Sequence, residues 1–317
     1  MSEYHNPVLL NESIDALITD PSGFYIDATF GGGGHSAEIL RRLSPEGRLM
    51  AFDRDSDAIA GKMDDDRLIL IHNNFRFVHN FALLEAGQAA RDYRECGVDG
   101  ILADLGVSSH QFDTADRGFS FRYEDAPLDM RMNTQAEVSA ATIVNGYEQE
   151  DLERILRIYG EVEKARKVAG LIVAARQKAE IRTTGEFDAA IKPALPAFAE
   201  HKYLAKVYQA LRIEVNQEMR SLEKFLDGAA KSLKPGGRLV VITYHSLEDR
   251  MVKNFIKTGN VDGTLEKDVF GRAETPLQAV NRKPILPQES EIASNTRARS
   301  AKLRIAERPH NEGRDGK

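Results

Sequence analysis

A run of four glycines directly after a short apolar segment constrains the fold of this chain more than any other feature. Residues 24–30 (FYIDATF) have the composition of a buried strand, the glycines occupy residues 31–34, and apolar residues then recur at helical spacing from Ala37 to Leu43. Glycine lets the backbone turn sharply and lets a ligand lie against it, and the free N–H groups at a helix start attract anionic groups. The order predicts a strand, a tight turn and a helix, with a ligand at the turn.

Strand and helix patterns alternate along the rest of the chain. Further strands are expected at residues 48–53, 68–71, 98–105 and 238–244, and one amphipathic helix at residues 209–226. Alternation of this kind implies a parallel sheet with right-handed crossovers. We therefore expect an α/β fold, with a Rossmann-like, mostly parallel sheet and helices on both faces.

A long helical interval separates the fourth and fifth of these strands. Because it is much longer than a crossover needs, residues 111–207 are interpreted as an inserted helical domain, and residues 1–110 and 208–317 as the main domain. Segments around residues 284–286 and 300–305 could add edge strands.

Composition excludes several classes of protein. Hydrophobic residues make up 42% and charged residues 29% of the 317, so the chain is too apolar to be disordered. Its single cysteine, Cys96, excludes a disulfide framework and a cysteine-based zinc cluster within one chain. It has no apolar run of membrane-spanning length and no secretory signal pattern, so we expect a cytoplasmic protein without a membrane partner.

The formal net charge of −6 is unevenly spread. Residues 1–160 contain 14 Lys+Arg and 28 Asp+Glu, whereas residues 161–317 contain 29 and 21. This split fits a polyanionic partner that meets the second half, or charge that falls unevenly without function.

Residues 117–122 (RGFSFR) could stack an unstacked base, or anchor a loop to the core. A basic run could follow a phosphate backbone, or be solvated surface: Arg297, Arg299, Lys302, Arg304 and Arg308.

A carboxylate at the end of the second strand indicates the kind of ligand. Asp53 lies 20 residues beyond Gly33, the spacing expected of an acid that accepts both hydroxyls of an adenosine ribose. Asp27 and Asp104 end the first and fourth strands, where they would repel a dinucleotide pyrophosphate but suit the ammonium or sulfonium of S-adenosylmethionine (SAM). The sequence therefore favours SAM over NAD. A tight turn beside a surface aspartate is the alternative without a ligand.

Other candidates follow the strands at the same edge, where open α/β sheets bind ligands. Phe75 could stack on adenine or belong to the core, and His245 is either a catalytic residue or a structural histidine. Asp104 could accept a proton from an amino group or orient the cofactor amine. Methylation of a pyrimidine carbon would need a thiolate, and Cys96 precedes the fourth strand at the opposite edge. An amino-group acceptor is therefore favoured.

Segments spread in order along nearly the whole chain carry a family resemblance. They are residues 5–10, 27–36, 52–55, 99–109, 117–121, 127–132, 209–216, 235–239, 244–250 and 297–304. Together they closely resemble the bacterial ribosomal RNA small subunit methyltransferase H (MraW) family. The resemblance implies a class I SAM-dependent methyltransferase with an inserted helical substrate-recognition domain. It also implies methylation of the N4 amine of a cytidine in the decoding region of 16S rRNA.

The resemblance implies site residues and partners as well. The cofactor contacts would be Gly33, Gly34, His35, Asp53, Phe75, Asp104 and Gln111, of which His35 and Gln111 come from the resemblance alone. No metal ligand is implied. The expected partner is 16S rRNA within the small ribosomal subunit, and a homodimer is compatible with a sequence that does not fix the oligomeric state.

Two other functions remain open at this point. A nicotinamide-dependent oxidoreductase would use a similar glycine loop, although Asp27 and Asp104 disfavour it. A ribosome-assembly factor would keep the fold without turnover, although the intact Gly33, Gly34 and Asp53 argue against a decayed cofactor site.

Overall fold

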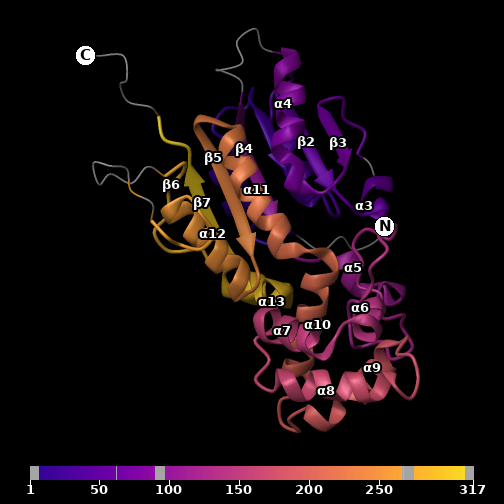
Figure 1. The fold of residues 1–317 in the computed structure, drawn as a ribbon. Helices are drawn as coiled ribbons and strands as arrows, with labels where there is room; N and C mark the ends of the chain where they lie inside the picture. Colours follow the sequence, from indigo (N-terminus) through magenta and orange to yellow (C-terminus); the bar gives the residue numbers. More distant parts are fainter. Residues whose placement is uncertain (1–6, 62, 90–96, 266, 268–274, 311–317) are drawn as a thin grey trace. The chain divides into compact units, whose positions relative to one another are not determined.

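The computed structural model describes the whole chain except residues 1–6, 62, 90–96, 266, 268–274 and 311–317. It divides into two compact units (Figure 1): unit 1 comprises Met1–Gly106 and Arg220–Lys317, and unit 2 comprises Val107–Met219. Unit 2 contains the insertion expected at residues 111–207 and extends past it, because its last helix, α10 (Glu200–Asn216), is continuous.

Unit 1 is built on a sheet of seven strands among the described residues, in the order β3-β2-β1-β4-β5-β7-β6. The strands are β1 (Phe24–Asp27), β2 (Arg48–Asp53), β3 (Leu68–His72), β4 (Val98–Asp104), β5 (Leu233–Thr243), β6 (Gln278–Ala279) and β7 (Lys302–Glu307). Strands β1 to β5 are parallel, and β7 is antiparallel to both of its neighbours. The predicted α/β fold with a mostly parallel sheet is confirmed, and the carboxyl ends of β1, β2 and β4 meet at one edge.

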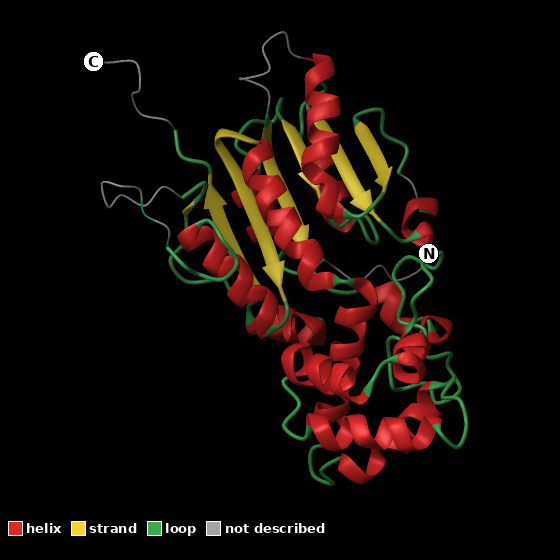
Figure 2. Ribbon diagram, in the orientation of Figure 1, coloured by secondary structure: helices red, strands yellow, loops and turns green. Residues whose placement is uncertain are grey.

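Alternate side chains of the strands face two layers of helix, because successive residues of a strand point to opposite faces. Leu49 and Ala51 of β2 pack in one apolar cluster with α1 and α2, whereas Phe52 meets Phe81 of α4 on the other face, with ring centroids 5.5 Å apart. Figure 2 shows α4, α11 and α12 in front of the sheet. The helices of unit 1 are α1 (Leu10–Leu17), α2 (Gly34–Arg42), α3 (Ser56–Ala60), α4 (Val78–Ala89), α11 (Glu218–Ser232), α12 (Ser246–Thr258) and α13 (Glu289–Ser294).

Three local expectations differ from the structure. The single helix expected at residues 209–226 is two helices, α10 and α11, because Gln217 adopts the left-handed conformation (φ 50°) and ends α10. Strand β5 begins at Leu233 rather than at the expected residue 238, and its pairing with β4 contains a register shift. Strand β7 is internal, between β5 and β6, and near residue 285 only an isolated bridge from Ile285 to Leu303 forms.

Unit 2 is helical, with its own apolar core. Its helices are α5 (Ser109–Asp113), α6 (Ala140–Gly146), α7 (Gln149–Gly160), α8 (Ala165–Arg176), α9 (Thr184–Ile191) and α10. The buried Asn216 side chain fastens the loop before α6 to α10, because its amide donates to Met130 O (2.7 Å) and accepts from Met132 N (2.9 Å). No helix in the described part of the chain has the length and apolar character that crossing a bilayer would require.

Gly118 provides a test of how tightly this loop is specified. Its φ of 68° is left-handed, and a Cβ at this position would lie 2.2 Å from Pro127 O. We expect Gly118→Ala to lower the free energy of unfolding by about 1–3 kcal/mol, measured by urea denaturation followed by circular dichroism. Gly146→Ala is the matched control, since a Cβ there meets nothing within 4 Å. Equal stability of the two variants would contradict the expectation.

Candidate functional site

The glycine loop between β1 and α2 is shaped by contacts that leave no room for side chains. Gly31 (φ 51°) and Gly33 (φ 77°) are left-handed, and Gly33 is the N-cap of α2. A Cβ on Gly33 would lie 3.1 Å from the Phe30 ring, and one on Gly34 would lie 2.3 Å from Cγ of Pro7. Glycine is therefore required by the turn at residue 33 and by the close approach of the N-terminal segment at residue 34.

His35, in the first turn of α2, faces both this N-terminal segment and the end of β4. The side chain is 5% exposed, its Nε2 lies 3.2 Å from Val8 O, and its Nδ1 lies 3.8 Å from Oδ2 of Asp104. The N-terminal segment is in turn fixed by the backbone N–H of Leu9, which donates to Oε1 of Glu291 at 2.7 Å. The cofactor contact that the resemblance implies for His35 stays a prediction.

A fully buried carboxylate, Asp27, organises the start of the loop. Its Oδ2 accepts a hydrogen bond from Ser36 Oγ (2.6 Å), and its Oδ1 accepts from Thr29 N (3.0 Å). Thr29 Oγ1 then accepts from the backbone N–H of Asp104 (2.7 Å). This chain of bonds joins the ends of β1 and β4 to α2, so Asp27 is satisfied by the protein itself.

Asp53, at the end of β2, also belongs to the glycine loop. Its Oδ2 accepts from Gly31 N and its Oδ1 from Asp55 N, both at 2.8 Å. Burial raises the pKa of Asp53, and these two N–H donors oppose the rise. The structure therefore brings together the strand-end acid and the glycine turn that the sequence spacing paired.

Asp104, at the end of β4, has a phenol and a histidine as neighbours. Tyr244 Oη donates to its Oδ1 at 2.8 Å, and His35 lies on the side of its Oδ2. Burial raises the pKa of Asp104 to about 6, with the nearby carboxylates of Asp27 and Glu248 raising it further and His35 and Tyr244 opposing them. A carboxyl group that titrates near neutral pH at a strand end is a candidate for proton transfer.

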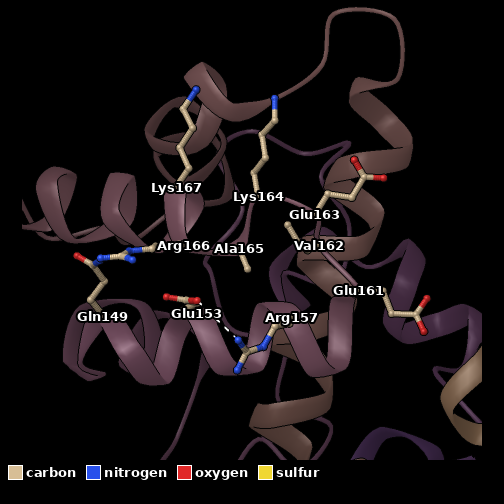
Figure 3. Close-up of a pocket in the computed structure, with 10 residues that line it drawn as sticks. All are labelled: Gln149, Glu153, Arg157, Glu161, Val162, Glu163, Lys164, Ala165, Arg166 and Lys167. Carbon is tan, nitrogen blue, oxygen red and sulfur yellow. Dashed lines mark ion pairs between the residues drawn. The ribbon is translucent and has the colours of Figure 1, made fainter.

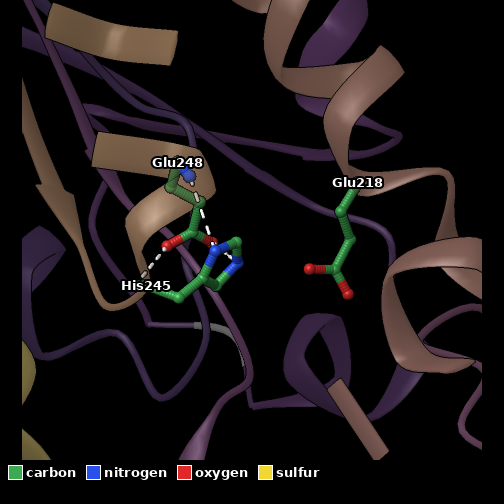
Figure 4. Close-up of side chains that lie close together, drawn as sticks. All are labelled: Glu218, His245 and Glu248. Atoms are coloured by element: carbon green, nitrogen blue, oxygen red, sulfur yellow. Dashed lines mark hydrogen bonds and ion pairs between the residues drawn. The ribbon is translucent and has the colours of Figure 1, made fainter. Parts of the chain in front are cut away.

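His245, a catalytic candidate in the sequence, is the N-cap of α12 in the structure (Figure 4). Its Nδ1 accepts from Glu248 N at 3.4 Å, and Oε2 of Glu248 accepts from His245 N at 3.3 Å. These reciprocal bonds form a capping box, and the side chain is 10% exposed. This geometry favours the structural interpretation. Glu218, also drawn in Figure 4, belongs to unit 2, where it pairs with Arg212 at 2.9 Å.

The remaining predicted residues are more dispersed. Phe75 begins a short 3-10 helix (Phe75–Phe77), and its half-buried ring packs edge-on against Phe225 at 5.2 Å. Gln111 lies in unit 2, 5% exposed, where its side chain accepts from Ser108 N within the capping box of α5. Cys96 lies outside the described residues.

Tyr244, Thr29 and Ser36 are functional candidates to which the sequence reasoning assigned no role. Each contributes a hydroxyl to the network around Asp27 and Asp104. The available signal was position: Tyr244 directly follows β5 and Thr29 lies two residues after β1, at the edge where open α/β sheets bind ligands.

Of the residues expected to contact nucleic acid, some are buried or paired with acids in the structure and others are accessible. Phe119 of the RGFSFR segment is buried, whereas the ring of Phe121 stacks on that of His201, with centroids 5.8 Å apart. In the basic C-terminal run, Lys302 and Arg304 pair with Asp249. A groove of about 780 Å³ between α7 and α8 (Figure 3) is lined by residues of both charges and by none of the predicted site residues.

The raised pKa of Asp104 generates a prediction about stability. The unfolded value is 3.8 and the folded value about 6, so the folded chain keeps a proton between these pH values that the unfolded chain releases, and stability falls as pH rises through this window. Asp104→Asn mimics the protonated form and keeps an oxygen for Tyr244. We expect it to raise the free energy of unfolding at pH 7.5 by about 2 kcal/mol, and not at pH 4.

Urea denaturation at both pH values measures this effect. Asp65→Asn is a control of opposite sign, because the Arg67 side chain lowers the pKa of Asp65 to about 2, and its ionised form stabilises the fold at pH 7.5. A gain for Asp104→Asn that is equal at both pH values would show that ionisation is not its cause.

A family model described as the MraW methylase family matches residues 2–309 of this chain. A protein of Bacteroides fragilis (strain YCH46), named Ribosomal RNA small subunit methyltransferase H, is 56% identical over 306 residues, which cover 96% of this chain and 97% of that protein. The protein of the same name from Flavobacterium johnsoniae is 52% identical, over 96% and 98% of the two chains. Together with the glycine loop and the parallel sheet, these matches show that the chain belongs to the MraW methylase family and is a class I methyltransferase whose cofactor is S-adenosylmethionine.

Proposed function

We propose that this chain methylates the exocyclic N4 amine of a cytidine in the decoding region of 16S rRNA. The observation that carries the substrate class is identity of 56% over 96% of the chain with a relative named as a small-subunit ribosomal RNA methyltransferase. The choice of N4 and of the decoding region rests on the family resemblance of the sequence motifs. The oxidoreductase alternative is set aside, because the family is one of methylases.

The donor set at the sheet edge fits the proposed role of each residue toward SAM. The turn at Gly33 and Gly34 lets the cofactor lie against the backbone, and Asp53 would accept the ribose hydroxyls. Asp104, with a carboxylate oxygen on the His35 side, would attract the positive charge of the cofactor or take the proton of the amine. When bound, SAM supplies the methyl group.

The acceptor amine is a poor nucleophile, because its lone pair is conjugated with the pyrimidine ring. The proposed transfer forms a bond from N4 to the methyl carbon as the bond from that carbon to sulfur breaks, and N4 then loses one proton. Positioning supplies most of the rate enhancement, and Asp104, with a pKa of about 6, is ionised at neutral pH and able to accept that proton. The base must be unstacked to reach the site.

Unit 2 is proposed as the RNA-recognition domain. Phe121 and the exposed His201 offer stacked rings on its surface, a feature that supports contact with unstacked bases. The basic balance of residues 161–317 supports a polyanionic substrate for this half of the sequence.

The proposed cofactor role of Asp53 predicts a loss of affinity. Asp53→Ala removes a charge-assisted acceptor, so SAM binding measured by titration calorimetry is expected to weaken by about 1.5–3 kcal/mol, or roughly 10- to 150-fold in Kd. Asp65→Ala, which removes an acid paired with Arg67 in the same unit, is the control and should leave Kd unchanged. Wild-type affinity in Asp53→Ala would exclude Asp53 from the cofactor site.

The substrate assignment is tested by methyl transfer from labelled SAM to undermethylated small ribosomal subunits. After digestion to nucleosides, mass spectrometry is expected to find the label in N4-methylcytidine at one position. Label in another nucleoside would refute the proposed acceptor atom. Intact SAM binding without any transfer would favour the assembly-factor alternative.

A further inference from the structure

The hydroxyl of Tyr244 is hydrogen-bonded to the carboxylate of Asp104, although the two residues are 140 positions apart in the sequence. Tyr244 Oη donates to Asp104 Oδ1 at 2.8 Å. The same carboxylate has its other oxygen on the side of His35 Nδ1, at 3.8 Å. The two oxygens of Asp104 are thus distinguished: one is held by Tyr244, and the other lies beside the loop that binds the cofactor.

Tyr244 is itself fixed in place by its surroundings. It directly follows β5, and its backbone N–H donates to Oε2 of Glu248 at 2.9 Å. The backbone of Gly106 (φ 102°) lies beside the ring, and a Cβ there would be in van der Waals contact with Cδ2 of Tyr244 at 3.6 Å. The phenol can therefore act as a rigid support for Asp104.

The charged and polar groups that act on Asp104 come from four different parts of unit 1. Carboxylates of Asp27 on β1 and Glu248 on α12 favour its protonated form, while His35 on α2 and the Tyr244 hydroxyl favour its ionised form. The pKa of Tyr244 is raised well above 10, by burial first and by the carboxylates of Asp104, Glu248 and Glu291. The phenol of Tyr244 is therefore protonated at neutral pH and can donate its hydrogen bond to Asp104.

We propose that Tyr244 is a positioning residue for Asp104, whose hydroxyl holds Oδ1 so that Oδ2 is directed to the reacting groups in the ionised state. This inference rests on the proposed function. Whether Asp104 binds the positive charge of the cofactor or accepts the proton of the amine, it acts as the carboxylate. The acid limb of activity therefore follows the ionisation of Asp104, and Tyr244 sets where that limb lies.

Loss of the hydroxyl should move this limb in a defined direction. Tyr244 donates to the ionised form, so Tyr244→Phe leaves that form less stabilised and raises the pKa of Asp104 above about 6. We expect the acid limb of kcat/KM for SAM to shift upward by about one pH unit, as for the loss of one hydrogen bond to a charged group. Activity would then fall several-fold at pH 6.5 and little at pH 8.5.

The decisive experiment is the pH profile of methyl transfer from pH 5 to 9 for wild type, Tyr244→Phe and Tyr147→Phe. Tyr147 is the matched control, because its hydroxyl also donates to a carboxylate, Oε1 of Glu214 at 2.9 Å, within unit 2. Its profile should coincide with that of wild type. A folded Tyr244→Phe with an unmoved acid limb would overturn the inference, as would an acid limb that persists in Asp104→Asn.

A second variant covers the case in which Tyr244→Phe does not fold. Fluorotyrosine at position 244 keeps the ring and strengthens the hydroxyl as a donor, so the limb should move to lower pH; no movement would overturn the inference. If wild type does not methylate rRNA, the proposed function fails on its own. The pH dependence of the Kd for SAM, compared between wild type and Tyr244→Phe without RNA, then decides the inference: a shift supports it and identical curves refute it.

Discussion

The site depends on the accommodation of one buried carboxylate, that of Asp27 at the end of β1. A polar group taken out of water must find hydrogen-bond partners within the protein, and here Ser36 on α2 and the backbone of Thr29 supply them. Thr29 passes the constraint on by accepting from the backbone N–H of Asp104. These hydrogen bonds fix the ends of β1 and β4 and the start of α2 relative to one another, and with them the glycine turn between β1 and α2.

The two other acids at this edge, Asp53 and Asp104, differ in the groups that donate hydrogen bonds to them. Asp53 receives two backbone N–H donors from its own loop and from the glycine turn, so it is preorganised as an acceptor beside the turn. Asp104 receives a phenol instead, together with a histidine, and burial brings its titration close to neutral pH. One sheet edge thus presents three acids with different local donors: Asp27 joins elements of the fold, and Asp53 and Asp104 are the acids proposed to bind the cofactor and to accept a proton.

The sequence was sufficient for the parts of the site that depend on local pattern. Strand composition and the spacing from Gly33 to Asp53 predict neighbours that the structure brings together through Gly31. The contact of Tyr244 with Asp104 joins distant segments and has no local signature. The break at Gln217 was missed because a left-handed glutamine carries no composition signal, unlike glycine. His245 shows a further limit of prediction from sequence. Because α12 begins almost directly after β5, one position serves both as the catalytic end of a strand and as the N-cap of a helix, and the sequence does not distinguish the two roles.

The hydrogen bond from Leu9 N to Glu291 joins residues 282 positions apart and fixes the segment that lies against Gly34. Such a bond requires closure of almost the entire chain, so it forms late both in folding and during synthesis from the N-terminus. Unit 2, by contrast, is one continuous stretch of the sequence, and its helices pack against helices from the same stretch. A nascent chain can therefore make the contacts of its insertion before the segment over its glycine loop is fixed, because the bond from Leu9 can form only after Glu291 has been synthesised.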